Sequence, residues 1–484
     1  MFSQPTIMKF GGTSVEDASG FERVCGIVCA QAGACSTVVV VSAMSRVTDA
    51  LLSSVKKAAE GQEDAASHLL SEHFERHSQV ARALLGLEER ATFEAELSES
   101  RGEIERLLRT VAQESVRRPV DNVAVCQLQD EVVSHGERMS ASLLARLLRA
   151  RGLAARYVDA RRCIVTNDEH GNAVPLIEET RGSTRRELEP LLEAREVPVL
   201  GGFIAASLSG ETTTLGRGGS DYSAALIGAA LSATEIQIWT DVTGVLTADP
   251  RLVQTARTIP RLSYSEAAEL AYFGAKVLHP KTIQPAIEKS IPVRICNSRA
   301  PEEAGTIVHT EAASSPRTVK AIAHKTGVTS VQVTAAQMLG AYGFLSALFK
   351  VFDRHRTVVD VVTTSEVSVS LTLDDASALP LILPELRELG EVEVETRRAI
   401  ICIVGEGLRS TPGIAARVFS TIQDINVSLI SQGASRINLT FVIDEARVRD
   451  AAERLHAAFF SEAEESRLSA SELQFRASAL DQQT

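Results

Sequence analysis

Residues 6–15 read TIMKFGGTSV, a short apolar run that ends in two glycines followed by hydroxyl side chains. The run 6–10 has the length and the residue types of a buried strand. Gly11 and Gly12 allow the backbone to approach an anion closely, and the helical pattern that follows would offer a helix N-terminus, which favours negative charge. Lys9 adds a positive charge, in an order unlike that of a Walker loop, where the lysine comes after the glycines. The stretch predicts a strand, turn and helix that together hold an anion.

The same alternation of strands and helices continues through the first two-thirds of the chain. Short apolar runs, often β-branched, occur at 36–42, 155–159, 197–201, 235–240 and 292–296. This order predicts an α/β fold, with a mostly parallel sheet sandwiched by helices. Ligands of such sheets bind beyond the carboxyl ends of the strands, so polar residues there are candidate site residues. We interpret the charged helical stretch 88–114 as a solvated helix pair.

The composition changes at residues 302–316, where Pro, Glu, Ala, Gly, Thr and Ser gather, and this predicts a domain boundary. Two units follow with the same order of strand, helix, strand, strand and helix. One more strand in each would give the ferredoxin-like βαββαβ arrangement, so we infer a tandem duplication. The expected domains are 1–310, 320–395 and 396–470, followed by a tail at 471–484.

Length and charge limit the classes of protein to consider. The chain has 484 residues, with 50 basic and 62 acidic side chains and a net charge of −12. A chain of this length divides into domains, because single cores stop growing at about 250–300 residues. The acidic balance argues against nucleic acid as a partner, and no apolar run approaches the roughly 20 residues of a membrane helix. The seven cysteines include no Cys-x-x-Cys pair, so we predict no metal site. No secretory signal is recognisable, so we expect a cytoplasmic protein.

A second candidate anion loop is the stretch 212–221, TTTLGRGGSD, which precedes an apolar helical run. Its glycines, hydroxyls and carboxylate suit a loop around anionic groups, and Arg217 could bind a carboxylate with two parallel hydrogen bonds. The stretch 239–251, WTDVTGVLTADPR, places polar groups at a strand end, where they could contact a nucleotide or form a capped hairpin. The stretch 273–280, FGAKVLHP, places Lys276 at the start of a helix.

These parts suit one reaction class, phosphoryl transfer, which depends on charge neutralisation, a metal ion and alignment. Lys9 and Lys276 could neutralise phosphate charge, and Asp221 could orient a lysine or bind magnesium through water. We therefore expect a kinase that uses ATP with Mg²⁺.

Four motifs in order, KFGGTSV, SHGE (residues 134–137), GRGGSDY and FGAKVLHP, resemble the aspartate kinases of the amino acid kinase family. The two C-terminal units resemble that family's paired ACT domains, so the resemblance covers nearly the whole chain. It implies the amino acid kinase fold followed by two ACT domains. It also implies ATP-dependent conversion of L-aspartate to 4-phospho-L-aspartate, the first step toward lysine, threonine, methionine and diaminopimelate.

The resemblance also implies roles for single residues. Lys9 would stabilise the transferring phosphoryl group, and Asp221 would position it. Glu137 would meet the substrate ammonium, and Arg217 its α-carboxylate. Further residues implied are Thr48 and Ser220 for the substrate, and Gly11, Gly12, Ser42, Thr240, Asp241, Arg251 and Lys276 for ATP. Leu246 replaces a tyrosine typical of the family, so an aromatic contact or a hydroxyl hydrogen bond to ATP is expected to be missing or supplied by another residue.

The first C-terminal unit resembles that of monofunctional, lysine-inhibited members of the family. Asp360 and Glu366 would receive an effector ammonium, which makes lysine the expected feedback inhibitor, while threonine or joint action with another metabolite stays open. ACT units commonly pair across a two-fold axis, so a homodimer or homotetramer is expected. The other expected effector residues are Met338, Tyr342, Gly343, Phe344, Leu345, Val359, Thr364 and Ser365.

Two alternatives stay open. One is another kinase of the same fold, acting on glutamate, acetylglutamate or carbamate, although the SHGE motif and the ACT units favour aspartate. The other is a catalytically silent amino-acid sensor. Retention of Lys9, Glu137, Arg217, Asp221 and Lys276 argues against it, because a sensor does not need them.

Overall fold

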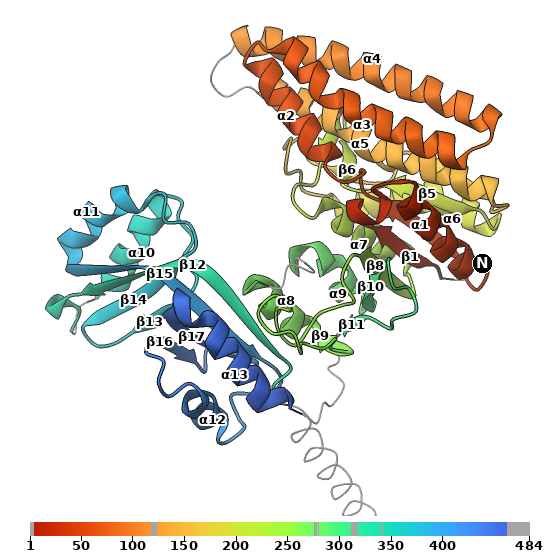
Figure 1. The fold of residues 1–484 in the computed structure, drawn as a ribbon. Helices are drawn as coiled ribbons and strands as arrows, with labels where there is room; N and C mark the ends of the chain where they lie inside the picture. The colour runs from red at the N-terminus through yellow and green to blue at the C-terminus, as the bar shows by residue number, and fades with distance from the viewer. Residues whose placement is uncertain are drawn as a thin grey trace, which may run out of the picture. The chain divides into compact units, whose positions relative to one another are not determined.

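The computed structural model describes residues 4–117, 123–274, 278, 280–310, 318–339 and 342–461. They form two compact units, whose helices and strands are labelled in Figure 1. The first unit comprises the described parts of 1–245, 260–264 and 277–311, and the second those of 246–259, 265–276 and 312–484. The predicted tail, 471–484, lies outside the described residues.

The first unit is built on an eight-stranded sheet in the order β3-β5-β2-β1-β8-β10-β11-β9. The six strands from β3 to β10 in this order run parallel, and β11 is antiparallel to β10. Every residue of β1, β2 and β5 is buried, which explains why these strands are mostly apolar, with Lys9 of β1 as the charged exception. The bounds are β1 (Thr6–Phe10), β2 (Thr37–Val41), β3 (Ala155–Val158), β5 (Val197–Gly201), β8 (Glu235–Thr240), β9 (Arg261–Ser263), β10 (Val293–Asn297) and β11 (Thr306–His309). The predicted α/β fold with a mostly parallel sheet is confirmed.

Two groups of helices pack on this sheet. One contains α1 (Ala18–Ala32), α2 (Val47–Ala59), α3 (Glu63–Leu84), α4 (Leu87–Arg117) and α5 (Val123–Ala150), and the other α6 (Ile177–Glu193), α7 (Gly219–Leu231) and α9 (Gln284–Glu288). Figure 1 shows α2 to α5 as a layer of long helices. A short sheet, β4 (Val165–Thr166), β6 (Ile204–Ser207) and β7 (Thr212–Thr214), leads into α7. Single-turn helices lie at η1 (Gly12–Val15), η2 (Ala160–Arg162) and η3 (Pro280–Ile283).

The prediction that residues 88–114 form a solvated pair of helices is wrong. The segment is part of α4, one helix of 31 residues. Phe93, Leu97 and Ile104 are buried in the same core as α5 and the sheet. Charged residues are frequent in α4, but its apolar residues recur at helical spacing and give it a buried face.

The second unit contains a six-stranded sheet in the order β13-β14-β12-β15-β17-β16. Its strands are β12 (Ala321–Thr334), β13 (Val362–Thr364), β14 (Ser368–Leu373), β15 (Glu391–Val404), β16 (Val427–Gln432) and β17 (Asn438–Asp444). Its helices are α10 (Phe344–Arg354), α11 (Leu379–Leu389), α12 (Ile414–Thr421) and α13 (Val448–Phe460), with single turns at η4 (Ala336–Met338) and η5 (Glu445–Arg447). The two predicted series of strand, helix, strand, strand and helix are present.

The two ACT-like units are nested, whereas the sequence predicted consecutive segments. Residues 321–325 of β12 pair with 400–404 of β15, and residues 328–334 pair with 391–398. The register shifts between Lys325 and Val328. Val319 and Ile322 accordingly belong to the core of the C-terminal unit. Along the chain, a strand of the second ACT-like unit therefore comes before the first ACT-like unit.

Two segments of the predicted catalytic region, 246–259 and the described part of 265–276, which is 265–274, belong to the second unit. Ala248 and Val253 pack against Ala452 of α13, and the Thr247 hydroxyl lies 2.9 Å from Nε2 of His456. Helix α8 (Tyr264–Tyr272) also belongs to this unit, apart from its first residue. A single domain at 1–310 therefore does not describe how these segments pack.

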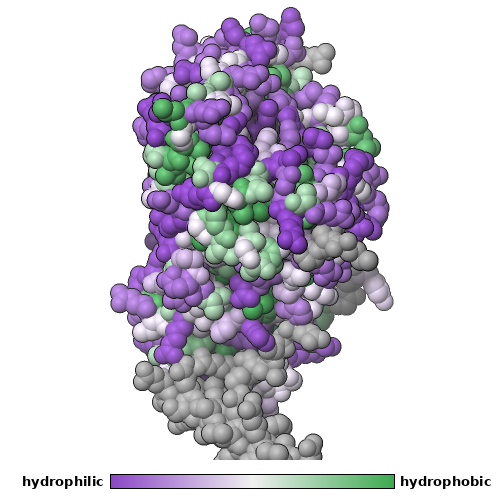
Figure 2. Space-filling view, turned by 90° about the vertical axis from the view of Figure 1, so that its right-hand side faces the viewer, coloured by the Kyte–Doolittle hydropathy of each residue, from purple (hydrophilic) through white to green (hydrophobic). Residues whose placement is uncertain are grey.

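None of the described helices is both long and apolar enough to cross a membrane. On the face in Figure 2, hydrophilic side chains predominate and hydrophobic ones form small separate groups. Such scattered apolar residues are normal on a folded surface.

Candidate active site

The candidate site lies at the carboxyl end of the first unit's sheet. Strand β1 pairs with β2 on one side and with β8 on the other. The chain continues from β1 toward β2 and reaches β8 only later, so the strand order reverses at β1. Open parallel sheets bind ligands at such a reversal.

A pocket of about 650 Å³ opens here, entirely within the first unit. Its size is in the range of about 300–1,000 Å³ that is usual for small-ligand sites. Residues from several segments far apart in sequence line it together. The predicted residues among them are Lys9, Gly12, Ser42, Thr48, Glu137, Arg217, Ser220 and Asp221.

An ion pair between Lys9 and Asp221 lies in the wall of the pocket. Nζ of Lys9 is 2.6 Å from Oδ1 of Asp221, and the side chains are only 11% and 16% exposed. Asp221 is in the first turn of α7, where the helix dipole favours a negative charge. The residue before the helix, Gly218, has a left-handed φ of 74°, and no side chain caps the helix. The N–H of Gly219 donates to the Gly216 carbonyl at 3.0 Å, so the next N–H groups, of Ser220 and Asp221, are those that face an anion at this helix end.

Glu137, on α5, is the most perturbed carboxylate of the pocket. Its side chain is buried, and Oε2 has no hydrogen-bond partner among the described residues. Burial raises the pKa of Glu137 to about 8, against the lowering effect of the Ala43 backbone N–H. Gly201 at the end of β5 lets α5 approach, because a Cβ there would lie 2.9 Å from Cβ of Glu137. A buried carboxylate with an open oxygen suits a cationic group of a ligand.

Arg217 is exposed in the loop between β7 and α7 and lines the same pocket. The loop turns at Gly216 and Gly218, which both have positive φ. Arg217 forms no ion pair with any residue that the structure describes. Its guanidinium is therefore available to a carboxylate or a phosphate.

The predicted nucleotide residues at the ends of β1 and β8 are neighbours. Gly11 N–H donates to the carbonyl of Trp239 at 3.0 Å, next to Thr240. The Thr240 hydroxyl donates to the Asp241 carboxylate at 3.2 Å. A hydrogen bond of 2.9 Å between Ser14 and Ser298, which the sequence did not predict, connects the ends of β1 and β10.

The structure does not place the other two predicted nucleotide residues, Arg251 and Lys276, in the first unit. Arg251 belongs to the second unit, where it pairs with Asp249 at 2.6 Å and is 85% exposed. Lys276 lies outside the described residues. Leu246, the departure from the family pattern, is bridged to Thr258 in the second unit.

The expected effector residues lie in the first ACT unit in different environments. Asp360 is buried and accepts a hydrogen bond of 2.6 Å from the Tyr272 hydroxyl. Nζ of Lys325 lies 3.5 Å from its carboxylate, and burial raises the pKa of Asp360. An effector ammonium at Asp360 would therefore meet two partners already in place, which the sequence did not predict. Met338, Phe344 and Val359 pack against the core, whereas Tyr342, Gly343, Leu345, Thr364, Ser365 and Glu366 are exposed.

Several pocket residues were not predicted. Gln129 and Val133 precede Glu137 by two turns and one turn of α5, so helical spacing could have found them. Arg46 has a left-handed φ of 68°, a strained conformation that is frequent at functional sites. No sequence signal pointed to Gly171, because its segment contains no motif. Thr214, Gly216, Gly218 and Gly219 also line the pocket and belong to the predicted anion loop 212–221. The remaining unpredicted lining residues are Ala43, Met44, Ser45, Asp49, Leu52 and Phe203.

Among the described residues, one cluster has the spacing of a metal site. Glu103, Glu131 and His135 offer ligand atoms within 4.8 Å of one another. Glu131 already lies 3.2 Å from Arg161 and 3.6 Å from Arg138. These arginines compensate its charge, so we assign no metal ion to the cluster.

Comparison with known proteins identifies the family. Residues 4–297 match the amino acid kinase family and residues 401–459 match an ACT domain. Lysine-sensitive aspartokinase 3 of Escherichia coli is 37% identical over 468 residues, which are 95% of this chain and 100% of the relative. Chloroplastic aspartokinase 1 of Arabidopsis thaliana is 36% identical, over 96% of this chain and 81% of the relative.

Solved structures agree with the sequence comparisons. E. coli aspartokinase III in complex with aspartate and ADP, in the R-state, has a TM-score of 0.79 and 34% identity. The same enzyme with lysine and aspartate, in the T-state, has a TM-score of 0.78 and 35% identity. Both comparisons cover 95% of this chain and 100% of the E. coli chain. The predicted resemblance is confirmed, and the chain belongs to the amino acid kinase family as an aspartate kinase with C-terminal ACT regulation.

Proposed function

We propose that the pocket around Glu137, Arg217 and Asp221 binds L-aspartate and presents its side-chain carboxylate to ATP. The main support for this proposal is the environment of Glu137. Its buried Oε2 has no hydrogen-bond partner among the described residues, and the substrate's ammonium would provide one and favour the ionised carboxylate. Arg217 lines the same pocket and offers the bidentate geometry that an α-carboxylate prefers. With both backbone groups held, the remaining carboxylate of aspartate is free to react.

In the reaction, an oxygen of that carboxylate attacks the γ-phosphorus of ATP. The bond from phosphorus to the β,γ-bridging oxygen breaks, and ADP leaves with that electron pair. Lys9 would balance charge on the transferring group, and Asp221 would hold Lys9 in place through the ion pair of 2.6 Å. Gly11, Gly12, Ser42, Thr240 and Asp241 would line the ATP site, and the ATP roles of Arg251 and Lys276 stay predictions from the sequence. Mg²⁺ would supply charge neutralisation on the phosphates, held by ATP and through water by Asp221.

Substrate analogues combined with matched variants test the two contacts separately. Succinate lacks the ammonium of aspartate, and the α-amide of aspartate lacks the α-carboxylate charge. We expect the preference of the wild type for aspartate over succinate to shrink by about tenfold or more in Glu137→Gln, the size of a lost charged hydrogen bond. Arg217→Ala should reduce the preference for aspartate over the α-amide in the same way.

Each variant should leave the other discrimination largely intact, which serves as the internal control. Full retention of both preferences in both variants, measured as ratios of kcat/KM, would contradict the assignment of these two residues.

We also propose feedback inhibition by lysine at the first ACT unit, with a place at the start of the lysine, threonine and methionine pathways. The support is the similarity to the lysine-sensitive E. coli enzyme, whose structure with lysine and aspartate has the same fold. Asp360 would receive an ammonium of the effector. Addition of lysine to an activity assay tests this directly, with threonine as the comparison.

A homodimer or homotetramer through the ACT units is part of this proposal. Leu345 and Phe349 are exposed apolar side chains one turn apart on α10, and Tyr342, just before the helix, is also exposed. Such an apolar surface suits an isologous contact. Sedimentation should give a dimer or larger assembly, and Phe349→Glu should shift it toward the monomer. The cytoplasmic location stays a prediction.

A further inference from the structure

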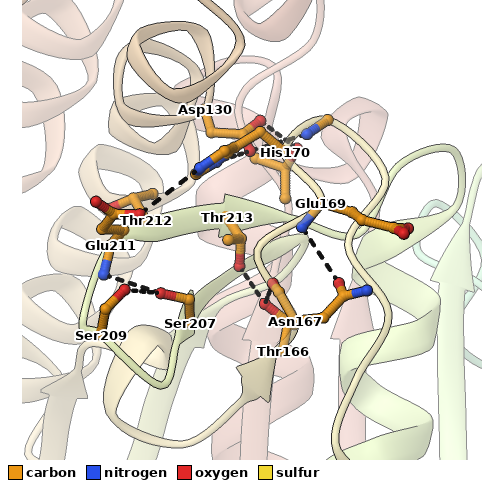
Figure 3. Close-up of polar contacts among 12 residues, drawn as sticks. Asp130, Thr166, Asn167, Glu169, His170, Ser207, Ser209, Glu211, Thr212 and Thr213 are labelled. Carbon is orange, nitrogen blue, oxygen red and sulfur yellow. Dashed lines mark hydrogen bonds and ion pairs between the residues drawn. The ribbon is translucent and has the colours of Figure 1, made fainter. Parts of the chain in front are cut away.

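Asp130 is a fully buried carboxylate on α5 to which the preceding assignments give no role. It accepts hydrogen bonds from the Thr214 hydroxyl at 2.6 Å and from the Gly171 backbone N–H at 2.9 Å. Nδ1 of His170 lies 3.1 Å away, and Figure 3 shows the two side chains facing each other. Burial raises the pKa of Asp130, whereas these hydrogen bonds lower it. A carboxylate with three partners holds its neighbours in fixed positions.

The partners of Asp130 come from two separate segments that both line the pocket. Gly171 lies in the connection between β4 and α6, and Thr214 is the last residue of β7. The connection and the strand approach each other only through tertiary structure. One buried side chain therefore ties two walls of the pocket to α5, the helix that carries Glu137.

The β4–α6 connection also lies against the loop that carries Arg217. Ala173 N–H donates to the Thr214 carbonyl at 2.8 Å. A Cβ at Gly216 would come within 2.4 Å of Oδ1 of Asn172, so this glycine is in close contact with the connection. Any displacement of the connection would therefore reach Gly216, the residue just before Arg217.

A second link supports the same arrangement. The hydroxyls of Thr166 and Thr213 are 2.6 Å apart and buried, and Figure 3 shows them joining the β4 segment to β7. Asn167 then accepts from the backbone N–H of Val174 at 2.8 Å, which closes the connection on itself. The connection is thus a well-ordered element with Asp130 as its contact to α5.

We propose that Asp130 is a positioning residue for aspartate binding, which holds the Gly171 and Thr214 walls so that Arg217 meets the α-carboxylate. The inference rests on the proposed assignment of Arg217 to that carboxylate. Asp130 itself acts through these walls and does not touch the substrate.

The test is a double-mutant cycle with Asp130→Ala and Arg217→Ala, read as KM and kcat for aspartate. Asp130→Ala should raise KM for aspartate about tenfold, or about 1.4 kcal/mol, with KM for ATP and kcat changed by less than about twofold. In the Arg217→Ala background the same change should raise KM by less than about twofold, because the group that Asp130 positions is gone.

Two further variants keep the test decisive if Asp130→Ala folds poorly. Asp130→Asn can keep its oxygen toward Gly171 and His170 and donate its amide to the Thr214 hydroxyl, so KM should stay within about threefold of the wild type. Thr214→Val removes one bond without changing the shape and should give a partial rise in KM. Thr184→Val is the matched control, since its hydroxyl is buried and bonded to the Cys163 carbonyl at 3.1 Å, away from the pocket lining.

An unchanged KM for aspartate in Asp130→Ala, with a loss of melting temperature like that of the control, would overturn the proposal and leave a purely structural residue. Equal effects of Asp130→Ala with and without Arg217 would also overturn it. An Arg217→Ala variant with unchanged KM would instead refute the substrate assignment itself, which separates the two failures.

Discussion

Nζ of Lys9, at the end of β1, lies 2.6 Å from Oδ1 of Asp221, in the first turn of α7. This ion pair joins the two glycine-containing segments that the sequence predicted to bind anions. It keeps a cation at the pocket when no phosphate is present, so the positive charge is in place before the reaction begins.

Replacement of Lys9 by Met should lower kcat by about 10²–10³-fold, the usual size of a lost electrostatic contact to a transition state. KM for aspartate should change much less, because Lys9 is expected to act on the phosphoryl group. Steady-state kinetics of the purified variant measure both values. Lys56→Met, an exposed lysine on α2, is the control. Full turnover in the Lys9 variant would refute its role.

The pH dependence of aspartate use should follow Glu137. Its pKa is about 8 in the free protein, so below that pH the carboxyl is mostly neutral and cannot pair with an ammonium. We expect kcat/KM for aspartate to rise about tenfold per pH unit below pH 8 and to level off above it. Glu137→Gln should have a low value without this slope. The same slope in wild type and variant would exclude Glu137 as its source.

Glu137 should also make the stability of the protein depend on pH. The free energy of unfolding should fall as the pH rises, whereas kcat/KM for aspartate should rise. Its folded-state pKa of about 8 exceeds the ordinary value of 4.5, so the folded protein keeps a proton that the unfolded chain releases. This group therefore lowers the free energy of unfolding as the pH rises from about 4.5 to about 8. Between pH 5.5 and pH 8.5, the free energy of unfolding measured by chemical denaturation should fall less for Glu137→Gln than for the wild type. An equal loss in both would contradict the raised pKa.

The buried ion pair between Lys320 and Glu266 should contribute to the stability of the second unit. Nζ and Oε2 are 2.8 Å apart, with side chains 5% and 0% exposed. Lys320→Met should lower the free energy of unfolding by about 3–5 kcal/mol, because it removes the buried cation that lies against the Glu266 carboxylate. The double variant with Glu266→Met should recover most of the loss. Glu453→Ala breaks the exposed pair with Arg449 and should cost less than about 1 kcal/mol. A similar small cost for Lys320→Met would contradict this account.

Asp360→Asn should raise the lysine concentration for half-inhibition by about tenfold or more, since a charged hydrogen bond to the effector would be lost. Activity with and without lysine measures the change as a ratio. Asp353→Asn, an exposed carboxylate on α10 of the same ACT unit, is the control. Inhibition at an unchanged lysine concentration would remove Asp360 from the effector site.

The sequence predicted the parallel sheet well because its buried strands are short, apolar and bounded by polar turns. Strands β1, β5 and β8 begin and end where the pattern predicted. The motifs also led to Lys9, near the end of β1, and to Arg217 and Asp221, which follow β7. Ligand sites of open parallel sheets lie at the carboxyl ends of the strands, where polar residues of this kind can be recognised in the sequence.

What the sequence could not predict depends on contacts between distant residues. The nested ACT units follow from antiparallel pairing of β12 with β15, and each half of β12 alone resembles an ordinary strand. The contacts of Asp130 with Gly171 and Thr214 join segments about 40 and 80 residues away from it, with no local pattern to indicate them. Tyr272 and Lys325, the two partners of Asp360, could not be predicted for the same reason.

The most direct test of the central claim is ATP turnover by the purified protein with Mg²⁺ and L-aspartate, with the acyl phosphate trapped by hydroxylamine. The assay should be repeated with L-glutamate, and with Arg217→Ala at low aspartate concentration. The account predicts hydroxamate with aspartate and little with glutamate, and a strong loss in the variant that excess aspartate partly restores. Equal product from glutamate, or equal turnover by the variant at low aspartate, would contradict the proposal that this pocket selects aspartate.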